Sequence, residues 1–107
     1  MSGAANPARG EVALVLGGVS HVLRPSFQAL VAAEGELGPL FEFVERAASG
    51  KLGIAEIAGL FWHCLKDPPA MDRAAFGDAL AAAGLKALAP ALRMLIVREQ
   101  RGEWVSP

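Results

Sequence analysis

The sequence predicts an α+β fold: a single domain over residues 1–107, in which a β-hairpin at about 11–24 precedes a compact body of four to five short helices at about 26–101. Two short runs rich in valine and leucine flank a pair of glycines, which predicts the hairpin. Later segments repeat their apolar residues every three or four positions between prolines and glycines, which predicts the helices. With 53% hydrophobic residues, the chain can form one core, and its two ends are expected to be flexible.

The hairpin is predicted from the runs at about 11–16 and 19–24. Gly17 and Gly18 lie between them and can adopt the positive φ angles that a two-residue turn requires. Because an isolated hairpin is only marginally stable in water, one of its faces must be covered by the helices. Because side chains alternate along a strand, every second residue lies on the same face. These faces consist of Val12, Leu14 and Leu16 in the first strand and of Val19, His21 and Leu23 in the second.

Two helices are predicted next, each closed by a glycine. The first opens at Pro25-Ser26 and ends at Gly38-Pro39, and the second runs from Leu40 to Ser49-Gly50. Helical spacing predicts an inward stripe on each, composed of Phe27, Leu30 and Val31 in the first helix and of Leu40, Phe41, Val44, Ala47 and Ala48 in the second.

The third helix is predicted from about Gly53 to Lys66, where Asp67-Pro68-Pro69 must end it because proline lacks the amide donor and disfavours helical geometry before it. Its apolar arc is unusually wide, since Leu60 and Trp62 flank the main stripe. That stripe consists of Ile54, Ile57, Ala58, Phe61 and Leu65.

The fourth and fifth helices are predicted on either side of Gly84. Asp72 is the expected N-cap of the fourth, Gly84-Leu85 its end, and Ala89-Pro90 the start of the fifth. The inward residues are expected to be Phe76, Ala79, Leu80 and Ala83 in the fourth helix and Leu92, Leu95 and Ile96 in the fifth.

Charge and cysteine usage limit the classes of partner. Ten basic and eleven acidic residues sum to −1, which predicts no nucleic-acid partner. The single cysteine, Cys64, cannot form an internal disulfide, and the first residues lack a signal-peptide layout, so a cytoplasmic location is expected. Every apolar run is shorter than the roughly 20 residues that cross a bilayer, so no membrane partner is expected.

The polar residues do not predict an active site. His21 and His63 are far apart in sequence and are interpreted as surface or hydrogen-bonded histidines. Cys64 follows His63, but neighbouring helical positions point about 100° apart, so Cys64 is interpreted as core packing. One cysteine and two distant histidines form no zinc motif. The sequence therefore predicts no enzyme, no metal and no cofactor.

An excess of apolar residues predicts a partner-binding surface instead. Leu60, Trp62 and Trp104 are the candidate partner-binding residues, since they exceed the evident needs of one small core. Tighter core packing is the alternative, and for Trp62 both interpretations stay open.

The stretch from Asn6 to Gly38 has a further pattern, formed by Asn6, Arg9-Gly10-Glu11, Gly17-Gly18, Leu23, Phe27, Ala29-Leu30, Glu34 and Gly38. With these residues the stretch resembles the opening of the gene-transfer-agent and phage tail-assembly protein family, which is also described as a tail-tube or tail-assembly-chaperone family. Weaker similarity extends to about residue 96. The family often has a small hydroxyl residue where this chain has Gly53, which weakens the expected start of the third helix.

The resemblance implies an assembly chaperone in the bacterial host. Such a chaperone is expected to bind the long helical tape-measure protein until tube subunits polymerise around it. The major tail tube protein and a second copy of the chain are further expected partners. The alternatives are a structural protein that stays in the finished tail and, less favoured, a regulatory binding module or an enzyme.

Overall fold

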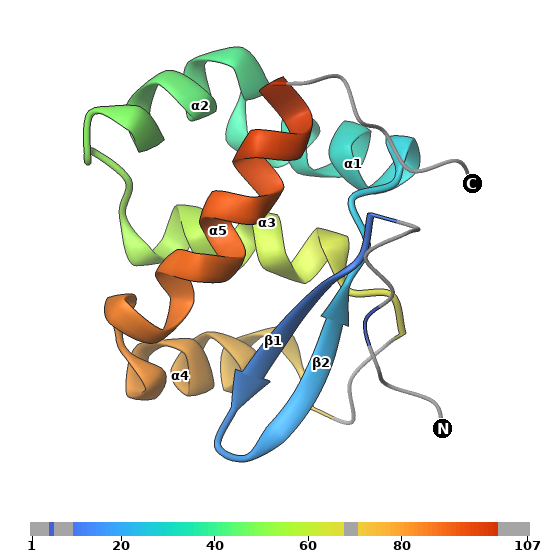
Figure 1. Ribbon diagram of the computed structural model, residues 1–107, viewed down its shortest axis with the longest axis vertical. Helices are drawn as coiled ribbons and strands as arrows, with labels where there is room; N and C mark the ends of the chain where they lie inside the picture. The colour runs from blue at the N-terminus through green and yellow to red at the C-terminus, as the bar shows by residue number, and fades with distance from the viewer. Residues whose placement is uncertain (1–4, 6–9, 68–70, 101–107) are drawn as a thin grey trace.

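The computed structural model describes residues 5, 10–67 and 71–100, and for residues 97–100 it describes the backbone alone (Figure 1). Within these residues a two-stranded antiparallel hairpin precedes five helices, so the predicted α+β class is confirmed. The elements are β1 (Val12–Leu16), β2 (Val19–Leu23), α1 (Phe27–Leu37), α2 (Leu40–Ala48), α3 (Ile54–Cys64), α4 (Arg73–Ala83) and α5 (Leu85–Gln100).

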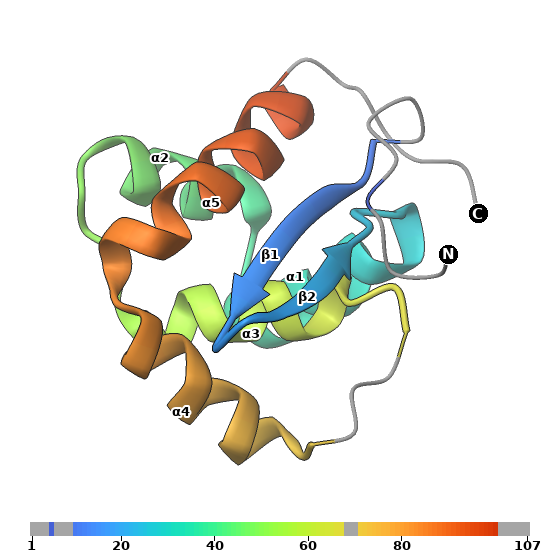
Figure 2. The same cartoon turned by 60° about the horizontal axis from the view of Figure 1, so that its bottom comes forward.

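The hairpin forms as predicted around its two glycines. Gly17 and Gly18 have φ angles of 56° and 80°, which are strained for other residues and close a two-residue turn. Leu16 pairs with Val19 beside this turn. The predicted core face of β1 is buried, and α4 and α5 pack against this strand (Figure 2).

The segment after α3 extends the hairpin by running along β2. The Arg24 amide donates to the Cys64 carbonyl at 2.6 Å, and the Lys66 amide donates to the Val22 carbonyl at 2.9 Å. These bonds occupy the outer edge of β2, which would otherwise lack partners. α3 therefore ends at Cys64 rather than at Lys66, and its end is held next to the start of α1.

α1 and α2 have the predicted bounds, and each buries only part of its predicted stripe. Ser26 caps α1, and the Glu34 carboxylate accepts from the Leu40 amide at 3.1 Å, which supplies α2 with a cap that its own sequence lacks. The predicted inward positions of Phe27, Val31 and Phe41 are wrong, because these side chains are exposed. The buried residues are Leu30 and Ala33 in α1 and Leu40, Phe43 and Val44 in α2.

α3 is the central helix of the core. It packs against α1 and α4, and it buries the predicted Ile57 and Phe61 together with Leu60 and Cys64. Ile54, predicted to face inward, is 40% exposed because the helix begins there, beyond its neighbours. The Glu56 carboxylate accepts from the Gly53 amide at 3.2 Å, so the helix start is capped although Gly53 has no side chain.

α4 follows the prediction and α5 departs from it. The Asp72 carboxylate accepts from the Ala75 amide at 2.8 Å, and α4 ends at Gly84, whose φ is 82°. The predicted start of the fifth helix at Ala89-Pro90 is wrong, because α5 already begins at Leu85 and includes this proline. Pro90 has no amide hydrogen, so the helix loses one backbone hydrogen bond there. Burial of Leu88, Ala91 and Leu95 on the same helix offsets this loss.

Among the described helices none is by itself both long and apolar enough to cross a membrane. α4 and the Leu85–Ile96 part of α5 reach that length only as a pair bent by 110°.

Candidate functional site

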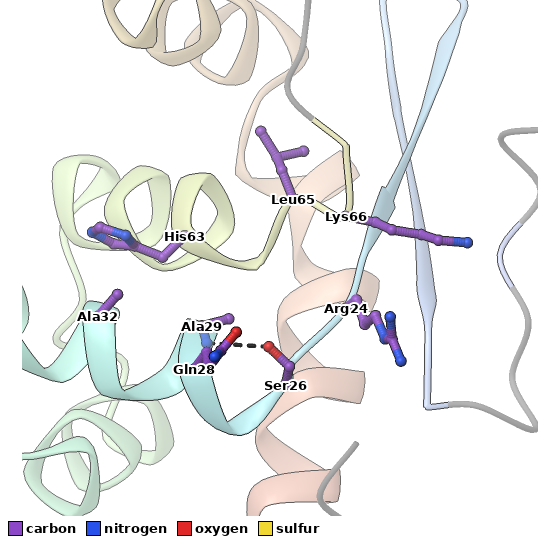
Figure 3. Close-up of a pocket in the computed structure, with 8 residues that line it drawn as sticks. All are labelled: Arg24, Ser26, Gln28, Ala29, Ala32, His63, Leu65 and Lys66. Carbon is purple, nitrogen blue, oxygen red and sulfur yellow. Dashed lines mark hydrogen bonds between the residues drawn. The ribbon is translucent and has the colours of Figure 1, made fainter. Parts of the chain in front are cut away.

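A groove lies between the start of α1 and the end of α3 (Figure 3). Its volume of about 420 Å³ is in the range of pockets that hold small ligands or single side chains of a partner. It is lined by Arg24, Ser26, Gln28, Ala29, Ala32, His63, Leu65 and Lys66.

Local sequence explains why a hollow forms here. Pro25 and Ser26 end β2, and the Ser26 hydroxyl accepts from the Ala29 amide at 3.1 Å, so α1 begins beside the strand. Ala29 and Ala32 line the groove from α1, and their short side chains leave space that larger residues would fill. The backbone bonds of Arg24 and Lys66 hold the opposite wall in place.

The lining of the groove is basic at one end. Arg24 and Lys66 lie at this end and His63 at the other (Figure 3), and the described lining includes no carboxylate. The Lys66 ammonium lies 3.3 Å from the carboxylate of Glu11, whose side chain is 1% exposed against 37% for Lys66. A buried carboxylate needs such a partner, so Glu11 also orients Lys66.

Beyond the His63 end, Glu36 of α1 binds residues of two other helices. His63 Nε2 lies 2.9 Å from Glu36 Oε1, and both terminal nitrogens of Arg73 donate to the same carboxylate. The hydrogen bond from Arg73 and then that from His63 lower the pKa of Glu36 to about 2, and the pairing raises the pKa of Arg73 further. This cluster of Glu36, His63 and Arg73 joins α1, α3 and α4.

These groups are suited to binding rather than to covalent chemistry. Cys64 is fully buried on the core side of α3, as its interpretation as core packing predicted, and so it points away from the groove. Arginine, lysine and histidine side chains bind carboxylates or phosphates through charge-assisted hydrogen bonds. The described part of the chain has no group of three or more His, Cys, Asp or Glu placed to hold a metal ion.

Leu60 and Trp62, the two predicted partner-binding residues within the described part of the chain, do not form an exposed surface there. Leu60 is 2% exposed, so the expectation of an exposed side chain there is wrong: it faces the core where α3 packs on its neighbours. Trp62 is half-buried against Phe76, with ring centroids 5.5 Å apart. Trp104 lies outside the described residues.

Two exposed apolar residues on α1 were missed as candidate partner contacts. Phe27 and Val31 are 62% and 51% exposed and lie one helical turn apart, so they form a stripe next to the α1 residues that line the groove. We call this pair the Phe27 stripe. The sequence contains a competing stripe of Leu30, Ala33 and Leu37, which could have signalled that Phe27 and Val31 face outward.

His21 lies apart from this site. Its ring packs edge-on against Phe76, with centroids 6.1 Å apart, and it faces the core from β2. It is therefore a packed histidine of the hairpin, and it is not among the residues that line the groove.

Comparison with known protein families identifies the family of the chain. The family model described as phage tail tube protein, GTA-gp10, matches residues 9–102, which is most of the sequence. The chain belongs to this phage tail family. The tail tube family is a family of structural phage tail proteins, so the resemblance inferred from the first residues is confirmed, and the role of the chain lies in the phage tail. Searches of curated proteins and of solved structures found no match.

Proposed function

We propose that the protein is a non-enzymatic tail assembly chaperone that binds the tape-measure protein in the cytoplasm of the bacterial host. The observation that carries the proposal is the Phe27 stripe, which leaves bulky apolar side chains uncovered beside a polar groove. Paired apolar and polar contacts of this kind suit an amphipathic helix, which is the form expected of a tape-measure segment. Masking its apolar face would prevent aggregation before the tube assembles.

The first test is co-expression of the tagged chain with a candidate tape-measure protein from the same phage or gene transfer agent, followed by pull-down. A stable complex is expected, and replacing Phe27 by Ser should weaken capture at least about fivefold, because exposed aromatic anchors dominate such interfaces. Leu85→Ser is the matched control, since Leu85 on α5 is similarly exposed. Absence of a complex, or equal losses in both variants, would contradict the proposal.

The second candidate is a structural protein that stays in the tail, favoured by the description of the matched family as a tail tube protein. In that case the major tail tube protein or a second copy of the chain would cover the Phe27 stripe. Mass spectrometry of purified particles separates the two candidates, because a chaperone should be absent from finished tails and a tube component present in many copies.

A further inference from the structure

We propose that the groove between α1 and α3 binds a carboxylate of an acidic partner segment, while an apolar side chain of the same segment packs on the Phe27 stripe. The inference deepens the proposed function by naming the chemistry of the bound segment, and it rests on that function only for the identity of the partner.

The charges lining the groove favour a carboxylate. Arg24 and Lys66 carry cationic side chains, and Glu11, which lies outside the described lining, pairs with Lys66. This end of the groove therefore has two cations for one carboxylate. An ammonium group has three donors, so Lys66 can contact a second carboxylate while it keeps Glu11. The Ser26 hydroxyl accepts from Ala29 and retains its own O–H as a donor. The N-terminus of α1 adds positive potential.

The apolar surface next to the groove determines which other side chains the bound segment must carry besides the carboxylate. Gln28 and Ala32 line the groove, while Phe27 and Val31 lie about 100° around the same helix. A ligand across the first two turns of α1 therefore meets donors on one side and apolar carbon on the other. An amphipathic helix with acidic and leucine-like residues presents this combination.

The surroundings disfavour an extended polyanion such as DNA. The net charge of the chain is −1, and acidic residues border the groove region: Glu36 beyond His63, with its carboxylate held by two cations, and the exposed Asp67 after Lys66. Nucleic-acid binding uses several phosphate contacts along a basic surface. A single carboxylate needs only the basic end of this groove.

A charge series at Gln28 tests the site without breaking the fold. This side chain is exposed, lines the groove and belongs to the first turn of α1. Gln28→Glu should stabilise the helix slightly, since a carboxylate is favourable at a helix N-terminus, yet it should weaken an acidic ligand about fivefold. Gln28→Lys should tighten binding by a similar factor while it destabilises the helix slightly.

Opposite trends in stability and affinity separate binding from a structural effect. Ala81→Glu is the matched control, because it adds the same charge at an exposed position of α4 and should leave affinity unchanged. Affinity that does not vary along the Gln28 series, or that also falls in Ala81→Glu, would overturn the proposal.

The probes are two short synthetic helical peptides of identical leucine pattern, one carrying Glu and the other Gln at every polar position. The Glu peptide should bind at least about fivefold more tightly, lose that advantage at high salt, and shift the amide NMR signals of residues 26–32 and 64–66. Equal binding of both peptides, or binding of duplex DNA at these same residues in their place, would overturn it.

The same variants distinguish this proposal from the proposed function. If the tape-measure protein is captured but the Gln28 series has no effect on capture or on peptide binding, the groove proposal fails and the chaperone stands. If the Glu peptide binds in the groove but no tape-measure complex forms, the groove proposal stands and the chaperone fails.

Discussion

α1 and α3 lie side by side and each has 11 residues, but they expose very different amounts of apolar surface. α3 packs against α1 and α4 and buries five of its residues, whereas α1 buries only Leu30 and Ala33. The same kinds of residue are therefore core in one helix and surface in the other, depending on how many neighbours surround the helix. The apolar residues left uncovered on the peripheral helix are the ones available to a partner.

The largest expected difference between the two helices is in the cost of losing an aromatic ring. Phe61→Ala in α3 should lower the free energy of unfolding by about 3–5 kcal/mol, because a fully buried ring leaves a cavity. Phe27→Ala in α1 should cost less than about 1 kcal/mol, since its ring is largely exposed. Urea unfolding measures both, and similar losses would show that the two helices do not differ as described.

Trp62 sharpens the comparison because it lies at the edge of the buried part of α3. Its half-buried ring packs on Phe76, so Trp62→Ala should cost about 2 kcal/mol of stability through lost packing. Capture of the tape-measure protein per folded molecule should stay unchanged. A large loss of capture with an unchanged melting temperature would instead make Trp62 a partner contact.

A third prediction compares one glycine in each helix. Gly35 of α1 has open space where a Cβ would be, so Gly35→Ala should raise stability by about 0.5–1 kcal/mol through helix propensity. In α3, a Cβ on Gly59 would lie 2.9 Å from the carboxylate of Glu36, so Gly59→Ala should gain less or nothing. Thermal midpoints measure both changes.

The control for the two glycine substitutions removes the Glu36 carboxylate, which lies closest to the added Cβ at Gly59. In a Glu36→Ala background the carboxylate is gone, and Gly59→Ala should then recover part of the gain that Gly35→Ala shows. The recovery should be partial because the Cβ would still lie 3.2 Å from Leu37 Cδ2. A full gain at Gly59 in the unmodified chain would contradict the close contact between Gly59 and the cluster.

The smallest expected effect concerns the ion pairs that join Glu36 of α1 to α3 and α4. The pKa of Glu36 is lowered to about 2 from an ordinary 4.5, so its contribution is complete above about pH 4.5 and is lost as the pH falls toward 2. Because the group is over a third exposed, solvent screening limits this contribution to about 0.5 kcal/mol. Glu36→Gln should remove that part of the acid dependence, as measured by urea unfolding at low salt.

Local chemistry in the sequence was sufficient for the strands, the turn and most helix ends. Gly17-Gly18, Ser26, Asp72 and Gly84 act through their own backbone or through hydrogen bonds to residues nearby, so their roles can be inferred without the rest of the fold. The groove could not be predicted in this way. Its walls come from the β2–α1 connection and the end of α3. These segments are distant in the sequence and are joined by the packing of α1 on α3 and by the backbone bonds of Arg24 and Lys66 to Cys64 and Val22.

The sequence by itself therefore determined the order of elements, because turn, capping and periodicity rules act within a few residues. The tail family was inferred separately, from the resemblance of the sequence to that family. Only the tertiary structure decided which face of each helix is buried, since that depends on which neighbours cover it. For this reason Leu60 is core and Phe27 is exposed. It also brought Glu36 to His63 and Arg73, which are 27 and 37 residues away along the chain, a distance over which local rules carry no information.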